Sequence, residues 1–287
     1  MIVSIGEILA DIFFDQSKGD MTARLGGAPF NMAVSAKRTG ADVAFIGRVG
    51  VDVLGNWLAA ECEKYGVDPY IQRDPYHNTT IAMVALNNGE RDFAFLRKYC
   101  ADYFVEVGEE LLDRLKPDVI HVGSLMLNEE KGVETAEKLF SYAKRKGIKT
   151  SFDVNFRSDI FENEKAAIAA YSPFIEKADI VKFSEDEITL FTGLSPEDGV
   201  KTFKDKIVCV TLGEKGSLVD AYGKIVRRPT KKVKPVDTTG AGDAFYGAFL
   251  AGIDQTKDLS EENLANILDS ANAKGAEATQ FLGAIKL

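Results

Sequence analysis

Seven residues near the end of the chain carry most of its chemical information. Residues 237–243 read Asp-Thr-Thr-Gly-Ala-Gly-Asp, and an apolar run follows them. The two glycines allow a tight turn, and the apolar spacing after it predicts a buried helix that begins there. The first backbone amides of this helix would lie without partners at the positive end of its dipole. These amides, which suit the charge of a phosphoryl group in transfer, belong to Gly240, Ala241, Gly242 and Asp243.

Asp243 lies at the edge of this expected anion site. A carboxylate there could accept the proton of an attacking hydroxyl, so the stretch predicts phosphoryl transfer to an alcohol. The alternative is a glycine-rich turn whose aspartate only caps the next helix, and an arbitrary Gly-x-Gly-Asp would favour it. The complete string, late in an α/β chain, reverses that preference. The chain has no Gly-x-x-x-x-Gly-Lys-Ser/Thr sequence, which excludes a Walker-type phosphate loop.

The elements that must position these residues alternate between strand and helix. Short β-rich apolar runs occur at 2–5, 43–47, 119–122, 150–154, 180–183 and 207–212, and helix-like segments at 129–146, 165–176 and 185–191. This alternation predicts an α/β fold with a mostly parallel sheet covered on both faces. Ligands bind beyond the carboxyl ends of such strands. The residues that follow strands, and are therefore expected at one crevice, are Asp153, Ser184, Gly213 and Asp243.

One segment departs from this alternation. Residues 80–86, Asn88-Gly89 and 91–97 predict a β-hairpin, because Asn-Gly is a preferred two-residue turn. With 11–14 and 22–25 the hairpin could form a small separate sheet, and the alternative is an antiparallel extension of the main sheet.

Composition restricts the class of protein. With 287 residues and 45% hydrophobic content, residues 1–287 are expected to form one large domain. Apolar runs are too short to span a membrane, no secretory signal is visible, and three widely spaced cysteines fit a reducing cytoplasm. A net charge of −9 without a basic stripe argues against nucleic acid. The only basic cluster, Lys231, Lys232 and Lys234, is interpreted as a solvated loop.

The late motif resembles the D-T-x-G-A-G-D signature of the ribokinase-like superfamily, the phosphofructokinase-B family of carbohydrate kinases. Gly-Gly-Ala-Pro-x-Asn at 26–31 is similar to the fructokinase version of the first family signature, which 47–55 continues. The resemblance implies a three-layer α/β/α fold with a β-sheet lid at approximately 11–25 and 79–98. It also implies an ATP-dependent fructokinase that converts D-fructose to fructose 6-phosphate, with Asp243 as general base.

The resemblance further implies which residues meet the sugar. Asp11, Gly27 and Asn31 are expected to contact it directly. Phe95 would cover an apolar face of the sugar and Arg97 would hold an oxygen, although packing within the hairpin is almost as well supported. Asn155 and Arg157 belong to a segment similar to the D-x-N-x-R element of fructokinases. These enzymes often have a Trp where this chain has Phe161, which weakens the fructose assignment slightly.

The nucleotide and metal residues are inferred in the same way. Ser184 begins a variant of the family's N-x-x-E motif, whose glutamate, here Glu187, is implied to organise Mg²⁺ through its water shell. The residues implied to border ATP are Ser184, Thr211, Gly213, Gly216 and Asn272. Asp237 and Thr239 lie where relatives bind a monovalent cation such as K⁺ through backbone oxygens. The sequence leaves open whether that site is filled.

Several alternatives stay open at this level. The acceptor could instead be 2-keto-3-deoxygluconate, ribose or a nucleoside, and a non-catalytic sugar sensor on a kinase scaffold is a rival of a different class. A homodimer formed by pairing of the lid sheets is plausible by analogy with the family.

Overall fold

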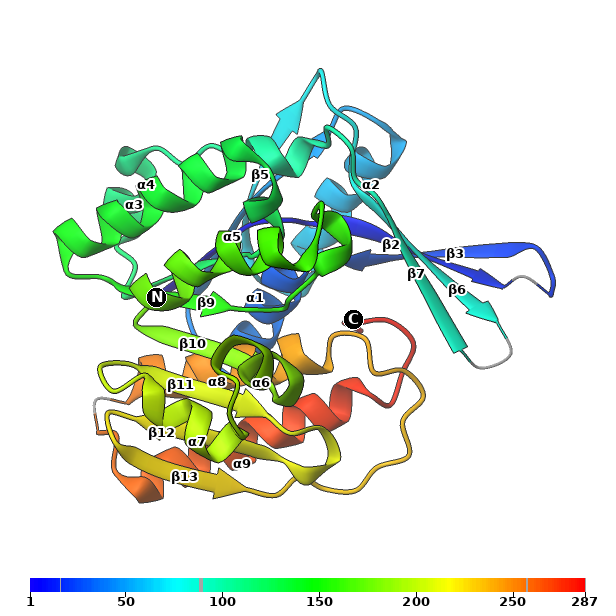
Figure 1. Ribbon diagram of the computed structural model, residues 1–287. Coiled ribbons are helices and arrows are strands. Elements are labelled where there is room, and N and C mark those ends of the chain that lie inside the picture. The colour runs from blue at the N-terminus through cyan, green and yellow to red at the C-terminus, as the bar shows by residue number, and fades with distance from the viewer. Residues whose placement is uncertain (16, 88–89, 257, 287) are drawn as a thin grey trace.

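The computed structural model describes residues 1–15, 17–87, 90–256 and 258–286 (Figure 1). A nine-stranded sheet forms its centre, in the order β13-β12-β11-β10-β9-β8-β1-β4-β5. The strands are β1 (Ile2–Ile5), β4 (Val43–Gly50), β5 (Asp68–Asp74), β8 (Val119–Val122), β9 (Lys149–Asp153), β10 (Ile180–Ser184), β11 (Ile207–Thr211), β12 (Ser217–Ala221) and β13 (Lys224–Arg228). The strands from β11 to β5 are parallel, whereas β12 and β13 are antiparallel additions at one edge.

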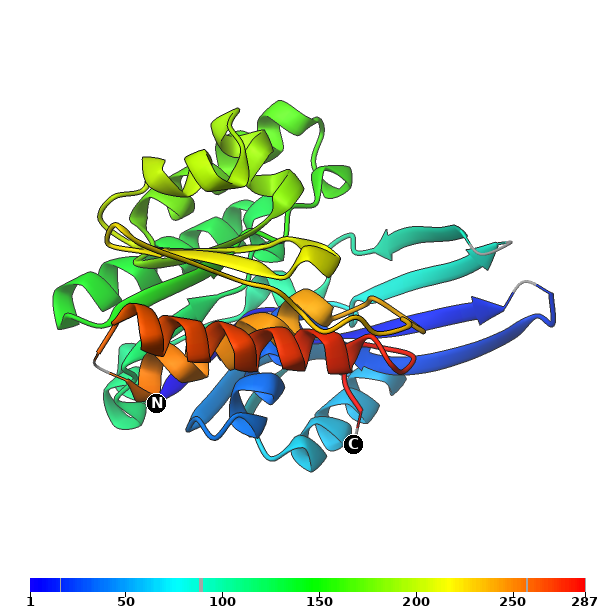
Figure 2. The same ribbon diagram turned by 90° about the horizontal axis from the view of Figure 1, so that it is seen from below.

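Helices cover both faces of this sheet, as the sequence predicts. They are α1 (Ala28–Arg38), α2 (Val53–Cys62), α3 (Glu109–Leu115), α4 (Glu130–Lys146), α5 (Glu164–Lys177), α6 (Glu185–Thr192), α7 (Pro196–Gly199), α8 (Ala241–Gln255) and α9 (Glu261–Ala278). Figure 2 shows α1, α8 and α9 on one side of the sheet and α4 to α6 on the other. Each side has its own apolar core. Strands such as β1 and β8 are buried at every position, because helices pack on both of their faces.

The mostly parallel sheet and its two helical layers are therefore confirmed. The sequence analysis left out β5 and the β12–β13 hairpin. The hairpin turns through Tyr222 and Gly223, which have φ of 55° and 89°. Positive φ at both central residues is typical of a type I′ turn, but a tyrosine in such a turn gives little sequence signal.

A second, four-stranded sheet projects from the body (Figure 1). Its order is β3-β2-β6-β7, with β2 (Leu9–Asp15), β3 (Asp20–Gly26), β6 (Ile81–Asn87) and β7 (Glu90–Leu96). Two antiparallel hairpins join through a parallel pairing of β2 with β6. The segment is thus a separate sheet and not an extension of the main one. The predicted Asn88-Gly89 turn lies outside the described residues.

Among the described residues, no helix combines the length and apolar character needed to cross a membrane.

Candidate active site

The start of α8 has the geometry expected of an anion site. Gly240 precedes the helix with φ of 73°, and no side chain in the described part of the chain caps the helix there. A Cβ on Gly240 would lie 2.6 Å from the Cα of Ala284, so this position requires glycine for both backbone conformation and space. The amide of Ala241 donates to the carbonyl of Thr238 at 3.3 Å. The expectation that all four amides are without partners is therefore too broad, because the turn itself uses one of them.

Asp243 lies in the first turn of α8 and is held from α1. The Nδ2 of Asn31 donates to its Oδ2 at 2.8 Å. This contact requires α1 and α8 to cross closely at Gly247, where a Cβ would lie 2.6 Å from the Cβ of Ser35. The hydroxyl of Ser35 also donates to the carbonyl of Ala244 at 2.5 Å. The two helices thus orient a carboxylate beside the expected anion site.

Burial raises the pKa of the Asp243 carboxyl above its ordinary value, while the Asn31 hydrogen bond and the charges of Lys182 and Arg157 oppose that rise. A carboxylate with a raised pKa is a stronger base than an exposed one. The Oδ1 of Asn31 is buried without a hydrogen-bond partner among the described residues. A sugar hydroxyl is one group that could donate to it.

Asp11 lies in the same site. It is 5% exposed, and its carboxylate packs so closely on Gly26 that a Cβ there would lie 2.6 Å from its Cγ. Burial, followed by the negative charges of Asp243 and Asp237, raises the pKa of Asp11 to about 7. Gly27, which precedes α1 with φ of 112°, approaches the backbone of Glu7, since a Cβ would lie 3.0 Å from its carbonyl carbon.

Glu7 and Lys182 are polar residues of this region that the sequence analysis did not single out. The Oε1 of Glu7 accepts from the amide of Ala28 at 3.2 Å, and its buried Oε2 has no partner among the described residues. Burial raises the pKa of Glu7 to about 8. Lys182 pairs with Asp153 beneath α8. The sequence offered one signal for Lys182: it is a charged residue within the apolar, strand-like run 180–183.

The raised pKa values predict how stability depends on pH. Folded Asp11 and Glu7 hold their protons up to about pH 7 and 8, whereas their ordinary pKa values are 3.8 and 4.5. The folded state therefore binds more protons than the unfolded state across this window, and the free energy of unfolding that these groups contribute falls as pH rises. We expect the free energy of unfolding of D11N, relative to that of the wild type, to increase by roughly 1–4 kcal/mol as the pH rises from 4 to 8.

Urea unfolding of the wild type, D11N and E7Q at several pH values measures this difference. E7Q should show the same trend and continue it to a higher pH. Parallel pH profiles for all three proteins would contradict the assignment of the two buried acids.

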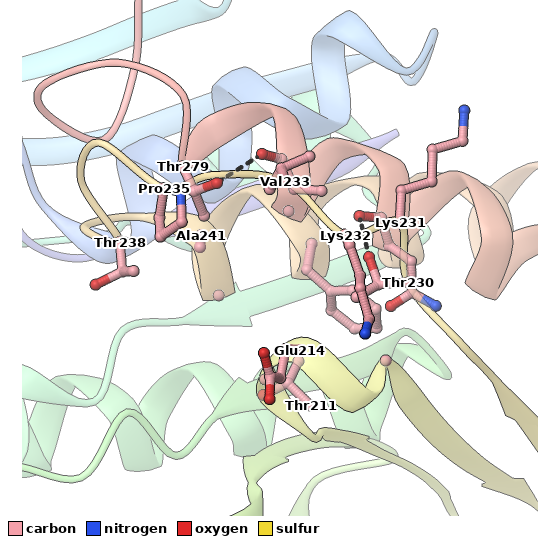
Figure 3. A pocket seen from close by; sticks show the side chains of 17 residues that line it. Thr211, Glu214, Thr230, Lys231, Lys232, Val233, Pro235, Thr238, Ala241 and Thr279 are labelled. Atoms are coloured by element: carbon pink, nitrogen blue, oxygen red, sulfur yellow. Dashed lines mark hydrogen bonds between the residues drawn. The ribbon is translucent and has the colours of Figure 1, made fainter.

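A cavity of about 430 Å³ opens between the start of α8, the turn after β11 and α9 (Figure 3). The predicted nucleotide residues Thr211, Gly213, Gly216 and Asn272 line it, together with Gly242. Gly216 has φ of 99°, and a Cβ there would lie 2.7 Å from the Cα of Pro229. Asn272 donates to the carbonyls of Arg228 and Pro229 at 3.4 and 3.3 Å. The cavity lined by the predicted nucleotide residues therefore reaches the start of α8.

Two lysines that the sequence analysis assigned to a solvated loop line this cavity. They are Lys231 and Lys232. Figure 3 shows the amine of Lys232 reaching down beside the cavity, on the side of Thr211 and Glu214, whereas that of Lys231 points away. The sequence shows only the basic cluster, and the fold places it at the cavity.

Ser184 does not line the cavity. It caps α6, accepting from the amide of Glu187 at 3.2 Å, while the Glu187 Oε2 accepts from the amide of Ser184 at 2.6 Å. The Oε1 of Glu187 also accepts from the amide of Phe156 at 2.7 Å. Glu187 thereby connects α6 to the segment that contains Asn155 and Arg157. Asn155 has a φ of 35°. This double role as helix cap and brace was not predicted.

The carboxylate oxygens at the sites implied for Mg²⁺ and a monovalent cation already accept hydrogen bonds within the protein. Each carboxylate oxygen of Glu187 can accept more than one hydrogen bond, so the side chain could still hold the water shell of Mg²⁺. Both carboxylate oxygens of the buried Asp237 accept from backbone amides, of Thr239 at 2.8 Å and of Gly283 at 2.9 Å. A monovalent cation at Asp237 and Thr239 would therefore depend on backbone oxygens.

Arg97 is buried inside the protein. Its Nε donates to Asp102 at 3.0 Å and its Nη1 to the Leu125 carbonyl at 2.7 Å, and its guanidinium stacks over the ring of Tyr103. These contacts favour the packing role over the sugar contact. Phe95 lies half-buried in β7.

Comparison with known proteins was consistent with this geometry. A family model described as pfkB family carbohydrate kinase matches residues 1–286. A probable fructokinase-2 of Arabidopsis thaliana is 35% identical over 99% of this chain and 92% of its own. The structure of fructokinase from Vibrio cholerae O395 in its fructose, ADP and calcium ion bound form has a TM-score of 0.87 and 32% identity, covering 99% and 94% of the two chains.

The structure of fructokinase with bound ATP from Xylella fastidiosa has a TM-score of 0.90 and 26% identity, covering 99% of this chain and 93% of that one. The match of the family model extends over nearly the whole chain, including the loop before α8 and both sheets. This chain belongs to the pfkB family of carbohydrate kinases.

Proposed function

We propose that this protein is an ATP-dependent fructokinase that converts D-fructose to fructose 6-phosphate, with Asp243 as general base. The observation that carries the proposal is the position of Asp243 in the first turn of α8, oriented by Asn31, next to a cavity that extends to Gly242. The similarity to fructokinases of a plant and of bacteria supports fructose as the acceptor.

In the proposed reaction the primary hydroxyl oxygen of the sugar attacks the γ-phosphorus of ATP in line. Asp243 accepts the hydroxyl proton, the new oxygen–phosphorus bond forms, and the bond to the β-phosphate oxygen breaks to release ADP. The amides of Gly240, Gly242 and Asp243 stabilise the charge that develops on the phosphoryl oxygens. Burial around Asp243 supports this role because it makes the carboxylate a better proton acceptor.

The acceptor would be held between the body and the small sheet. Asp11 and Asn31 offer hydrogen-bonding groups to the sugar hydroxyls, and Gly27 permits close approach. Asn155 and Arg157 would provide further polar contacts to the sugar, and Phe95 would contribute an apolar surface. We assign the small sheet as a lid that excludes water, which would otherwise compete as acceptor.

The nucleotide would occupy the cavity lined by Thr211, Gly213, Gly216 and Asn272. Bound Mg²⁺ would neutralise charge on the β- and γ-phosphates, and Glu187 would hold its water shell. Backbone oxygens at Asp237 and Thr239 would bind K⁺. We propose that residues 1–287 act as one kinase domain in the cytoplasm, where thiols such as the three buried cysteines stay reduced.

A panel of acceptors tests the substrate assignment. With saturating Mg·ATP and coupled ADP detection, D-fructose should give the highest kcat/KM among fructose, 2-keto-3-deoxygluconate, ribose and a nucleoside. Identification of fructose 6-phosphate as the product completes the assay. A higher kcat/KM for another acceptor would identify that compound as the substrate in place of fructose. Fructose binding without ADP release would show that the protein is a non-catalytic sugar sensor.

We also propose a homodimer formed through the lid. β3 and β7 are the edge strands of the small sheet, and Met21 and Leu96 on them are 64% and 57% exposed. Open strand edges and exposed apolar side chains gain from pairing with a second copy. Light scattering should give twice the 31.4 kDa of one chain, and L96K should shift the mass toward the monomer. A monomeric wild type at assay concentrations would exclude this assembly.

A further inference from the structure

A buried ion pair joins two neighbouring strands of the main sheet below the candidate active site. Lys182 of β10 is 5% exposed and Asp153 of β9 is 6% exposed. The two residues are directly opposite each other in the parallel pairing. The Nζ of Lys182 donates to both carboxylate oxygens of Asp153, at 2.8 and 3.0 Å. Burying this pair costs desolvation free energy, which good geometry only partly offsets.

The ammonium lies directly against the first turn of α8. A Cβ added to Gly242 would be 3.2 Å from the Nζ of Lys182 and 3.8 Å from its Cε. Gly242 also lines the nucleotide cavity. The positive charge is therefore on the sheet side of the turn that we assign to the phosphoryl group.

This location is unfavourable for a residue that only braces two strands. The N-terminal end of a helix carries the positive end of its dipole, so a cation there lowers stability and an anion raises it. An uncharged pair could join β9 and β10 without this cost. The position is instead suited to a site that must attract negative charge.

We infer that Lys182 is a positioning residue for phosphoryl transfer: held by Asp153 against Gly242, its ammonium keeps Asp243 ionised and adds positive charge beneath the phosphoryl site. The inference rests on the proposed function. Asp243 supplies the base, and the amides at the start of α8 contact the phosphoryl oxygens. Lys182 acts on both from the side away from the substrate.

Other charged and polar groups face Asp243 and Lys182 from the surrounding elements. Asp243 receives the Asn31 hydrogen bond from α1 and the positive charges of Lys182 and Arg157. Burial raises the pKa values of Glu7, Asp11 and Asp153, and the charge of Asp243 raises them further. Burial, together with the Lys182 charge, lowers the pKa of His121 to about 3. The negative charge of Glu187 also acts on Asp153 and Lys182.

The first test measures Asp243 directly and requires no turnover. The protein is labelled with ¹³C at aspartate carboxyls, and D243N assigns the Asp243 signal. We expect K182M to raise the titration midpoint of Asp243 by about one pH unit or more, because an opposite charge nearby lowers a carboxyl pKa by about that amount. K182R should restore most of the wild-type midpoint. A failure of the fructokinase assignment would leave this measurement valid.

Lys206 provides a matched control. It is a second buried lysine, whose ammonium donates to the carbonyls of Ile175 and Glu176 at 2.8 and 2.7 Å. K206M should lower stability without moving the Asp243 midpoint. An equal shift in K206M and K182M would show a general effect of lost packing and would overturn the inference.

The second test is kinetic. K182M should lower kcat by roughly 10–10²-fold with little change in KM for the sugar, and should move the acid limb of the kcat–pH profile upward. K182R should recover much of the loss. If K182M does not fold, the double variant D153N/K182Q keeps a hydrogen-bonded, uncharged pair and should shift Asp243 in the same direction. If Asp243 titrates as in the wild type and kcat is unchanged in these variants, the ion pair only joins the two strands and the inference is wrong.

Discussion

Replacement of Asp243 by asparagine is expected to lower kcat by about 10²–10⁴-fold, the usual loss when a general base is removed. The amide has nearly the same shape as the carboxylate, so α8 and the nucleotide cavity should be unchanged. It cannot accept the hydroxyl proton at neutral pH. Because Asp243 would act in the transition state, KM for the sugar should change much less than kcat.

Steady-state ADP release with the wild type and D243N measures this effect. The matched control is D254N on the same helix, since Asp254 lies near the end of α8, where its carboxylate is 3.5 Å from the N-terminal ammonium. D254N should keep normal turnover. If D243N retains nearly wild-type kcat, Asp243 is not the base and the proposed mechanism fails.

The second large effect is expected at Gly240. An alanine there would have to adopt φ near 73° and would place its Cβ within 2.6 Å of the Cα of Ala284. We expect the turn to shift, the amides that precede Asp243 to lose their alignment, and kcat to fall on the order of 10²-fold. The free energy of unfolding should fall by roughly 1–3 kcal/mol because of the backbone strain.

Gly193 provides a control that separates the effect of backbone strain from the effect of a displaced turn. It follows α6 with φ of 71°, and, apart from its chain neighbours, no atom of the residues that the structure describes lies within 4 Å of the position a Cβ would take. G193A thus introduces similar strain without a collision. Denaturation and ADP release should show a stability loss in both variants and a loss of kcat in G240A alone. Normal turnover in G240A would contradict the assignment of this turn as the anion site.

The parts of the site that are local in sequence could be predicted. Positive φ at Gly240 and the helix that begins at Ala241 follow from a glycine-containing turn before an apolar run. The hairpin of β6 and β7 and the positions of most core strands along the chain follow from apolar runs and turn residues. Short-range sterics and hydrogen bonding dominate these features, and a single stretch of residues contains the information.

Two other assignments changed once the contacts of each side chain were known. Arg97 was a candidate for a sugar oxygen, but Asp102, Leu125 and Tyr103 surround its guanidinium. Ser184 was a candidate for ATP, but its side chain caps α6. The burial of Arg97 and its contact with Leu125 depend on the folded chain. The cap at Ser184 has a local signal, the spacing Ser-x-x-Glu of a capping box, which the sequence analysis did not use.

The type of reaction was predicted from a single loop of the sequence, which contains Gly240, Gly242 and Asp243. The arrangement of the groups around this loop became known only from the folded chain. Asn31 reaches Asp243 across 212 positions of the chain because Gly247 lets α1 and α8 cross closely. The buried charges around Asp243 come from separate strands and helices, and their electrostatic effect depends on distance and desolvation. Those quantities exist only once the chain has folded.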